Sequence, residues 1–539
     1  MTNDFFPSAT RRDFLRLGGA LAVAATFAGG LSACGATPAD QAKGSSSGAA
    51  QLKADGTITA AISYELGTNG FDPMTTSAAL CLAANWHTME GLTEILPTGT
   101  REVYPAVAKE LPKKVDDTTY EAVIREGATF HDGTPVTADD VVHSFQRVLD
   151  PANESMYVQF LTFLDGVTKK DDKTVTIKLK HAFSLVNERL AVVKIVPKAA
   201  STKDAKAFDA MPIGTGPWKM TDNSATSKEL VFERFDGYKG SHPAKAAKMV
   251  WKVMPDEATR TNAMTSKAVQ AMDLVPDLSI QTLKGAATVE SVQGFSVLFA
   301  MFNCGSEPFK DVRNRQAFLY AIDMDKVIKT AYLGNATPAT SFLDEAHPAY
   351  QKASTVYSFD AEKAKKLFAE TGLKKIRLLC TDHGWVKKAT PLIKEALEAA
   401  GISVDFAEKK SPDVYNTIDG KPEAYDAVIA PGDPSVFGAD PDLLMRWWYS
   451  NPTWADSRMH WKGQESFTKV QALLDEAVKQ TGEEQKATWG KAFNLLSETV
   501  PLYPLMHRKS TTAFDAASLT DFKPIALTGL SFIDVASSK

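Results

Sequence analysis

The sequence predicts an α/β fold of two lobes joined by a hinge. In the last third of the chain a strand (Lys375 to Cys380), a helix (Lys388 to Ala400) and a second strand (Ile402 to Phe406) follow one another. This alternation is typical of a largely parallel sheet. The apolar stretches 297–303 and 501–504 are predicted to cross between the lobes. Lobes joined in this way leave a cleft, which is the usual place for a ligand.

Start and stop signals predict the helices. Thr137 followed by Asp140 indicates an N-cap, and apolar residues then recur at helical spacing until Asp150 and Pro151. Asp360 is expected to cap a helix over 361–371 that Gly372 ends. An amphipathic helix is also expected near 256–266. The remaining expected strands are Thr57 to Ile62, Tyr120 to Arg125, Thr174 to Leu179 and Ala427 to Ala430.

Composition indicates a globular chain that does not bind nucleic acid. Of the 539 residues 44% are hydrophobic and 23% are charged, which argues against wholesale disorder and against a polytopic membrane protein. The formal net charge is −5, whereas nucleic acid demands a basic surface. About 490 residues follow the N-terminal segment, enough for two or three cores at roughly 100–200 residues per domain.

The N-terminal residues are predicted to form an export signal. Arg11 and Arg12 precede Phe14 and Leu15, and residues 17–30 are uncharged. This stretch is shorter than the roughly 20 residues of a membrane-spanning helix, so we expect the apolar region of a signal peptide. The arginine pair resembles the twin-arginine signal, which implies export of the folded protein.

A lipid attachment site is expected at Cys34. Leu31 to Gly35 resembles a bacterial lipobox, and the Ala, Gly and Ser-rich stretch that follows is predicted to be a flexible tether. Two or three acyl chains hold a protein durably on a membrane. The alternative is an exported soluble protein with an incidental cysteine. Lipidation of Cys34 leaves Cys81, Cys304 and Cys380, which allow one disulfide at most.

Several longer segments carry a family resemblance. They are, in chain order, Phe130 to Val141 (FHDGTPVTADDV), Gly214 to Trp218 (GTGPW), Phe235 to Gly240 (FDGYKG), Asp311 to Arg313 with Ala321 to Asp323, and Val500 to Pro504 (VPLYP). Together they resemble the extracellular solute-binding proteins of family 5, which serve importers of oligopeptides, dipeptides and nickel. Most of these residues have local structural reasons to be present, so the motifs indicate architecture first.

The resemblance implies a type II periplasmic-binding-protein fold in its large form, with an extra small domain. It implies a monomeric binding protein without catalytic residues, cofactor or structural metal, which captures a small solute such as a short peptide. It also implies partners, the permease and ATPase subunits of an ABC transporter, and an extracytoplasmic position on the outer face of the membrane.

The expected domains follow the chain in discontinuous segments. They are a signal peptide (1–33), a tether (34–52), lobe I (53–88, 212–300 and 501–539), an extra domain (89–211) and lobe II (301–500).

Asp433 is the candidate residue for binding a cationic group. In peptide-binding members of the family, a Trp-x-x-Asp segment supplies a carboxylate that pairs with the α-ammonium of the peptide. The comparable segment here is Ala430 to Asp433, which keeps the Asp and lacks the Trp. A carboxylate shielded from water attracts an ammonium strongly. The alternative is that Asp433 only caps a turn.

Aromatic residues are further candidates for lining the cleft. Trp447 and Trp448 follow Asp433 along the chain, and Trp86 lies in the first segment of lobe I. Aromatic walls suit sugars, aromatic side chains or cations, although adjacent aromatics on a helix are more often part of the core.

Other functions remain open at this stage. A sugar, an opine-like compound or a metal chelate is the alternative ligand, and a chaperone or signalling receptor could share the fold. The main alternative of another class is a secreted, lipid-anchored hydrolase. Its G-x-S-x-G match, Gly44 to Gly48, falls in the tether, where no strand-to-helix elbow forms.

Overall fold

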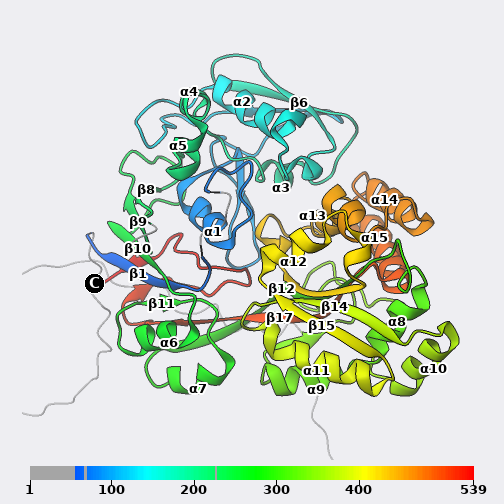
Figure 1. Cartoon of the computed structure of the whole chain (residues 1–539). Coiled ribbons are helices and arrows are strands. Elements are labelled where there is room, and N and C mark those ends of the chain that lie inside the picture. Colours follow the sequence, from blue (N-terminus) through cyan, green and yellow to red (C-terminus); the bar gives the residue numbers. More distant parts are fainter. Residues whose placement is uncertain (1–54, 66–69, 225–227) are drawn as a thin grey trace, which may run out of the picture. The chain divides into compact units, whose positions relative to one another are not determined.

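The structure is a computed structural model that describes residues 55–65, 70–224 and 228–539 (Figure 1). Arg11, Arg12 and Cys34, with the predicted signal peptide and tether, lie outside the described residues. Residues 50–539 group into one compact unit, so the subdivision into lobes and an extra domain stays a prediction, and we keep those names for the ranges given above. Among the described residues, no helix has the length and apolar character needed to cross a membrane.

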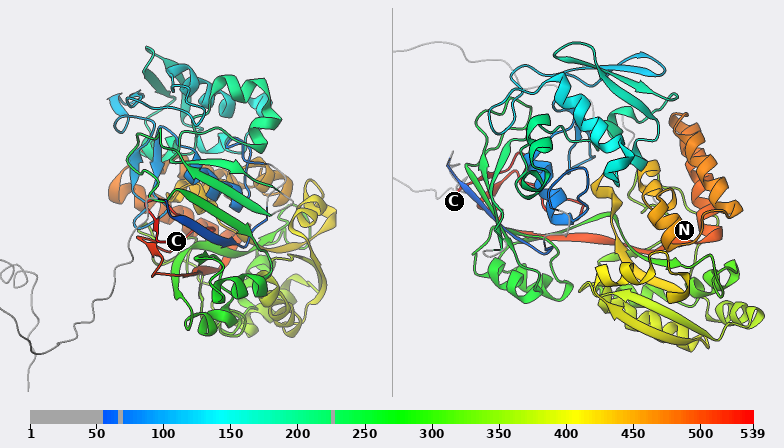
Figure 2. Two further views of the ribbon diagram at one scale, coloured as in Figure 1. Left: turned by 90° about the vertical axis from the view of Figure 1, so that its left-hand side faces the viewer. Right: turned by 45° about the horizontal axis from the view of Figure 1, so that its top comes forward.

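Two long antiparallel strands lie in the middle of the largest sheet, between a strand of the lobe II range and a strand of the lobe I range. They are β12 (Thr288–Phe302) and β17 (Leu502–Phe514), and Figure 2 shows β17 running across the unit. Val289 pairs with Ala513 at one end, and Ala300 pairs with Tyr503 at the other. The register shifts between Gln293 and Val297, so the ladder is interrupted midway along the strand. In the described part of the chain, strands on both sides of this pair complete an 11-stranded sheet.

Lobe I surrounds one end of the long strands. Its other elements are β1 (Thr57–Ile62), α1 (Ala79–Thr88), β8 (Trp218–Asp222), β9 (Glu229–Arg234), β10 (Lys248–Val253), α6 (Glu257–Thr265), β11 (Ala271–Met272), α7 (Ile280–Leu283), β18 (Leu519–Thr520) and β19 (Ala536–Ser537). β1 lies parallel to β10, and β11 joins β17. Trp218 and Trp251 are fully buried in a core shared with α1.

Lobe II contains the predicted parallel strands. Its elements are α8 (Val312–Tyr320), α9 (Met324–Ala331), β13 (Ala336–Pro338), α10 (Ala361–Thr371), β14 (Lys375–Thr381), α11 (Val386–Ala399), β15 (Ser403–Lys409), α12 (Ser411–Ile418), β16 (Ala427–Gly432), α13 (Pro441–Tyr449), α14 (Glu465–Ala477) and α15 (Gly482–Thr499). β14 lies between β15 and β16 and is parallel to both, which confirms the prediction. Helix α10 has the predicted bounds, while α11 begins two residues before its predicted start.

The range 89–211 contains a small sheet of its own. Its elements are β2 (Thr93–Ile95), β3 (Val103–Pro105), β4 (Lys113–Asp116), β5 (Thr119–Val123), α2 (Ala138–Leu149), β6 (Leu164–Lys169), β7 (Thr174–Leu179), α3 (Val186–Leu190), α4 (Lys198–Lys203) and α5 (Ala205–Ala210). Thr137 and Asp140 form a capping box on α2, as predicted. Residues 129–135, directly before this helix, form a turn closed by one isolated bridge.

Close backbone contacts and burial explain the conspicuous motifs. A Cβ atom on Gly214 would lie 2.0 Å from the carbonyl oxygen of Thr88, and one on Gly216 would lie 2.5 Å from that of His87. Glycine therefore lets this segment pack on the last turn of α1.

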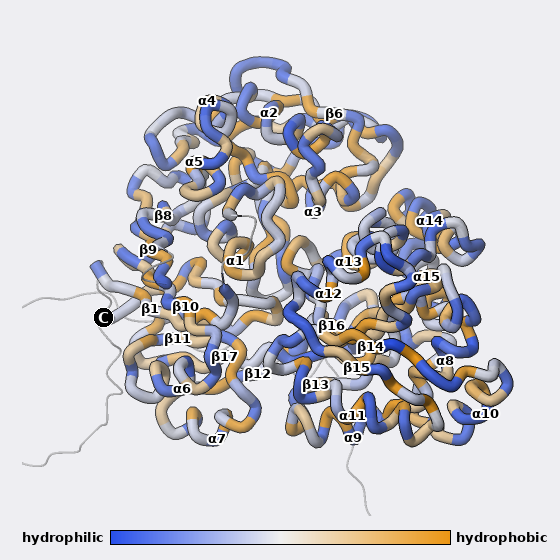
Figure 3. The backbone as a smooth tube through the Cα atoms, viewed as in Figure 1, coloured by the Kyte–Doolittle hydropathy of each residue, from blue (hydrophilic) through white to orange (hydrophobic). Residues whose placement is uncertain are grey.

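Figure 3 shows hydrophobic stretches along the inner strands and hydrophilic ones on outer helices such as α10 and α14. Cys81, Cys304 and Cys380 are buried and form no disulfide with one another.

Candidate functional site: a cavity between the lobes

A cavity of about 710 Å³ lies where lobe I, the extra domain and lobe II meet. Its lining comes from the loop 99–101, helix α3, residues 293–295 of β12, the lobe II segments 344–349 and 435–444, and residues 526–527 near the C-terminus. Cavities of roughly 300–1,000 Å³ commonly hold small ligands. Because distant segments converge here, movement of one lobe against the other would change the cavity directly.

The interrupted part of β12 forms one wall of this cavity. Gln293, Gly294 and Phe295 line it at the position where the register with β17 shifts. A Cβ atom on Gly294 would lie 2.2 Å from the carbonyl oxygen of Ala526, so glycine permits this close approach. Phe295 is buried behind the wall, and its ring stacks on Trp448 with centroids 5.9 Å apart.

Five ionisable side chains line the cavity, and they differ in their partners. The Nε2 atom of His347 lies 2.8 Å from the carbonyl oxygen of Ala439. Asp440 receives a hydrogen bond from Arg189 at 2.5 Å. Asp344 accepts one from the amide of Ala346 at 3.0 Å. Glu188 and Arg101 form no ion pair with any described residue. Burial raises the pKa of Glu188, and burial lowers the pKa of Arg101 to about 10.

Asp433 lies directly after β16 and lines a second cavity of about 150 Å³. Its Oδ2 accepts hydrogen bonds from the backbone amide of Thr528 at 3.1 Å and from the Thr528 hydroxyl at 2.8 Å, and its Oδ1 accepts one from the Ser435 hydroxyl. Burial raises the pKa of this half-buried carboxyl, although those hydrogen bonds oppose the shift. Asp433 therefore links lobe II to the C-terminal segment of lobe I.

This geometry bears on both interpretations of Asp433. The residue precedes the short 3₁₀ turn 434–436, and its side chain accepts a hydrogen bond from the Ser435 hydroxyl of that turn but none from a backbone amide of the turn. Asp433 also lines the second cavity, and its role in binding a ligand stays a prediction. Ala430, the residue in place of the family's Trp, is fully buried and pairs with Phe299. A Trp-sized side chain has no room at that position.

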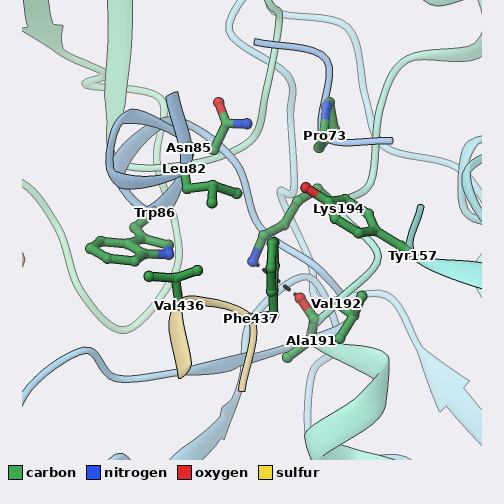
Figure 4. A pocket seen from close by; sticks show the side chains of 10 residues that line it. All are labelled: Pro73, Leu82, Asn85, Trp86, Tyr157, Ala191, Val192, Lys194, Val436 and Phe437. Carbon is green, nitrogen blue, oxygen red and sulfur yellow. Dashed lines mark hydrogen bonds between the residues drawn. The ribbon is translucent and has the colours of Figure 1, made fainter. Parts of the chain in front are cut away.

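Trp86 borders two smaller cavities beside the main one. These cavities, of about 40 and 30 Å³, share Trp86, Lys194, Val436 and Phe437. Figure 4 shows the indole of Trp86 on α1 facing the lobe II residues Val436 and Phe437. Lys194 donates to the carbonyl oxygen of Ala191 at 3.1 Å and pairs with Glu94 at 2.5 Å. Trp86 therefore lies beside residues 436–437 of lobe II, and its place in a ligand-binding cleft stays a prediction.

The two adjacent tryptophans of α13 have different surroundings. Trp447 is half-buried, and its ring centroid lies 5.0 Å from that of Phe437 and 6.1 Å from that of Phe160 in the extra domain. Trp448 is fully buried in the lobe II core against Phe295 and Phe299. Trp86 and Trp447 thus both lie near Phe437: Trp86 shares a small cavity with it, and the ring of Trp447 contacts its ring. The indole of Trp448 packs against Gly432, because a Cβ atom on Gly432 would lie only 2.5 Å from it.

Arg189 is an interface residue that the sequence reasoning missed. Its Nη2 atom donates to Asp440 at 2.5 Å and to Asp442 at 2.8 Å, which connects α3 of the extra domain to the start of α13. The side chain is only 1% exposed. In the described ranges, no group of three or more His, Cys, Asp or Glu side chains is placed to hold a metal ion.

Comparison with known proteins identifies the architecture. The family model of bacterial extracellular solute-binding proteins, family 5 middle, matches residues 102–469. The heme-binding protein A of Haemophilus influenzae is 28% identical over 452 residues, covering 76% of this chain and 80% of the relative. The glutathione-binding protein of Escherichia coli K12 is 25% identical over 429 residues, covering 78% and 83%.

A solved structure agrees with this assignment at the level of the fold. The periplasmic binding protein DppA of Helicobacter pylori, in complex with the peptide STSA, superposes with a TM-score of 0.79 at 21% identity, covering 90% of this chain and 98% of the other. The family and these proteins are named as binding proteins rather than enzymes. The chain therefore belongs to the family 5 bacterial extracellular solute-binding proteins and has their two-lobed, type II periplasmic-binding-protein fold.

Proposed function

We propose that the protein is the substrate-binding lipoprotein of an ABC importer, which captures a short peptide or similar solute with a cationic amine and delivers it to the permease. The observation that carries the proposal is the cavity of about 710 Å³, whose walls come from both lobes, the extra domain and the interrupted strand β12. A ligand held there would contact every part that moves on closure. The proposal includes no catalytic role.

The named ligands of the relatives support a peptide-type solute. Glutathione is a small peptide, and the structure from Helicobacter pylori holds the peptide STSA. The heme-binding relative is named for a different kind of compound, so membership of the family does not by itself identify the ligand. Glu188 in the main cavity and Asp433 in the second cavity are the candidate carboxylates for an amine, and an ammonium beside either one would offset the cost of burying that carboxylate.

Closure of the lobes is the mechanism that we infer for capture. Two contacts bridge separate parts at the cavity, one from Arg189 to Asp440 and one from Thr528 to Asp433. Entry of a ligand requires these contacts to part, and a bound ligand would stabilise the closed arrangement by contacts on both sides. The permease would then recognise the closed form. Export by the twin-arginine route and lipidation at Cys34 would keep the protein at the outer face of the membrane.

Calorimetric titration with a library of dipeptides to pentapeptides tests this function. We expect 1:1 binding of amine-bearing peptides to the wild type and no hydrolysis of the bound peptide. If Asp433 pairs with a desolvated ammonium, Asp433→Asn should weaken binding by about 3–5 kcal/mol, roughly a hundredfold to several thousandfold. Equal affinity in the variant would remove Asp433 from the site, and no binding by the wild type would contradict the peptide assignment.

A further inference from the structure

Arg101 lies in the loop that joins β2 to β3, at the edge of the main cavity. Its φ of 59° is left-handed, a conformation that a residue with a long side chain seldom adopts. The backbone amide of Arg101 donates to the carbonyl oxygen of Thr98 at 3.2 Å, which closes the turn. The side chain borders the cavity of about 710 Å³ and also the cavity of about 30 Å³. The turn thus places a guanidinium where the two cavities meet.

This guanidinium has no protein partner among the described residues. Its Nε atom is buried without a hydrogen-bond acceptor, and no carboxylate of the described chain lies within ion-pair distance. Asp433 and Asp440 are near enough to raise the pKa of the Arg101 guanidinium. However, Asp433 accepts hydrogen bonds from Thr528 and Ser435, and Asp440 accepts them from Arg189. A guanidinium carries five N–H donors and no acceptor, so it has unused capacity that faces the cavity.

Other buried arginines of the chain show what a structural arginine looks like here. Arg125 pairs with Glu90 at 2.8 Å, Arg189 pairs with Asp440 at 2.5 Å, and Arg446 pairs with Asp442 at 2.9 Å. Each of these guanidinium groups is neutralised by a carboxylate, as buried charges generally are. Arg260 and Arg315 are also buried and have no carboxylate partner within the described ranges, but both donate to backbone carbonyl oxygens, and the buried Arg508 lies over the ring of Trp385. Arg101 has neither a carboxylate nor a carbonyl partner for its guanidinium among the described residues. Because the pKa is lowered only to about 10, the side chain stays charged at neutral pH and needs an anion.

We propose that Arg101 binds a carboxylate of the captured solute, so that the ligands of this protein carry a free carboxylate, as at the C-terminus of a short peptide. The proposal rests on the proposed function and names the second charged group that the ligand must have. A guanidinium matches the two oxygens of a carboxylate in a bidentate arrangement. Glu188 lines the same cavity, so the cavity offers unpaired charges of both signs.

A carboxylate is a better match than a phosphate or another dianion. Glu188, Asp344 and Asp440 also line the cavity, and Asp433 lies next to it. With more acidic than basic side chains, the surroundings would repel a second negative charge. A ligand with one carboxylate at Arg101 and an amine elsewhere satisfies both signs.

The first test compares a peptide acid with its amide. Trialanine and trialanine amide are titrated calorimetrically into the wild type, Arg101→Gln and Arg101→Lys. The matched control is Arg313→Gln, which changes an exposed arginine of lobe II. We expect the wild type and Arg313→Gln to prefer the acid by at least tenfold. In Arg101→Gln the acid should bind about a hundredfold more weakly, with little remaining difference between the two peptides. Arg101→Lys should bind the acid more tightly than Arg101→Gln and more weakly than the wild type, since lysine keeps the positive charge but lacks the paired N–H donors of the guanidinium.

Two results would overturn the role of Arg101 in this test. One is equal binding of the acid and the amide by the wild type, and the other is unchanged acid binding by Arg101→Gln. Both would leave peptide capture itself intact, because the wild type still binds. Failure of both peptides to bind the wild type would instead contradict the proposed function for these ligands.

A second measurement judges Arg101 without a peptide. Melting temperatures are recorded for ligand-free wild type and Arg101→Met in sodium chloride and in sodium propionate of equal concentration. In chloride we expect Arg101→Met to melt at a higher temperature than the wild type, because the substitution removes an unpaired buried charge. We expect propionate to raise the melting temperature of the wild type but not that of Arg101→Met. A lower melting temperature for the variant would show that Arg101 serves the fold. The same response of both proteins to propionate would contradict carboxylate binding, whether or not the peptides bind.

Discussion

His87 shows how a single buried side chain fixes a distant segment beside the site. Its Nε2 accepts a hydrogen bond from the amide of Phe532 at 2.8 Å, so Nδ1 carries the proton and donates to the carbonyl oxygen of Ala83 at 2.7 Å. The imidazole thus attaches the C-terminal segment to α1, the helix of Trp86. His131 also contacts the backbone, because its Nε2 lies 3.0 Å from the carbonyl oxygen of Gly216. His143 and His383 contact the hydroxyls of Ser201 and Thr381.

The first prediction concerns the pH dependence of stability at this residue. Burial lowers the pKa of His87 from 6.5 to about 4, because the charged imidazolium would lose its contact with water. A lowered pKa contributes stability above pH 6.5, and this contribution is lost as the pH falls toward 4. The loss is at most about 3 kcal/mol. His87→Asn should therefore be less stable than wild type at pH 7 in urea unfolding, and the difference should shrink toward pH 4. A difference that does not change with pH would contradict this role.

At the scale of elements, the contact between α3 and α13 holds the extra domain against lobe II. Arg189 also donates to the carbonyl oxygen of Phe160 at 3.1 Å, so it joins two segments of the extra domain to the Asp440 that caps α13. Next to it, the amide of Ser184 donates to the carbonyl oxygen of Val478 at 2.9 Å. Asp442 keeps Arg446 as a second partner, whereas Asp440 would lose its charged partner without Arg189.

Arg189→Met should therefore open the protein. Removing one member of a buried ion pair leaves an unpaired charge and costs about 3–5 kcal/mol, here at the closed interface. We expect a larger radius of gyration by small-angle scattering for the ligand-free variant. Arg189→Met combined with Asp440→Asn should restore part of the compact form, and Arg313→Met on the surface serves as the control. A wild-type radius for Arg189→Met would show that other contacts determine closure.

The elements differ in how much the sequence could predict. The bounds of α10 follow from Asp360 and Gly372, because both caps act within one turn of the helix. The parallel order of β14, β15 and β16 follows from their alternation with helices. The contact of Arg189 with Asp440 joins residues 251 positions apart, and no local pattern records such a pair. For the same reason Trp447 and Trp448 could not be distinguished before their neighbours from other segments were known.

At the scale of the whole molecule, the account joins membrane attachment to capture. Cys34→Ala should release the mature protein from the membrane fraction into the soluble extracytoplasmic fraction, because the predicted tether has no membrane affinity without its acyl chains. Cell fractionation followed by immunoblotting measures this. Cys304→Ala, which changes a buried cysteine of lobe II, should remain with the membrane. Retention of Cys34→Ala on the membrane would remove the lipoprotein assignment and leave the fold unaffected.

The central claim is that the solute binds in the cavity of about 710 Å³ between the lobes, and blocking that cavity tests it most directly. Ala439 lines this cavity, while the exposed Ala399 lines a separate surface cavity on lobe II. Calorimetric titration of a peptide that binds the wild type should show no binding to Ala439→Trp and wild-type affinity for Ala399→Trp, with circular dichroism confirming that both variants fold. Unchanged affinity of the folded Ala439→Trp protein would contradict capture at this site.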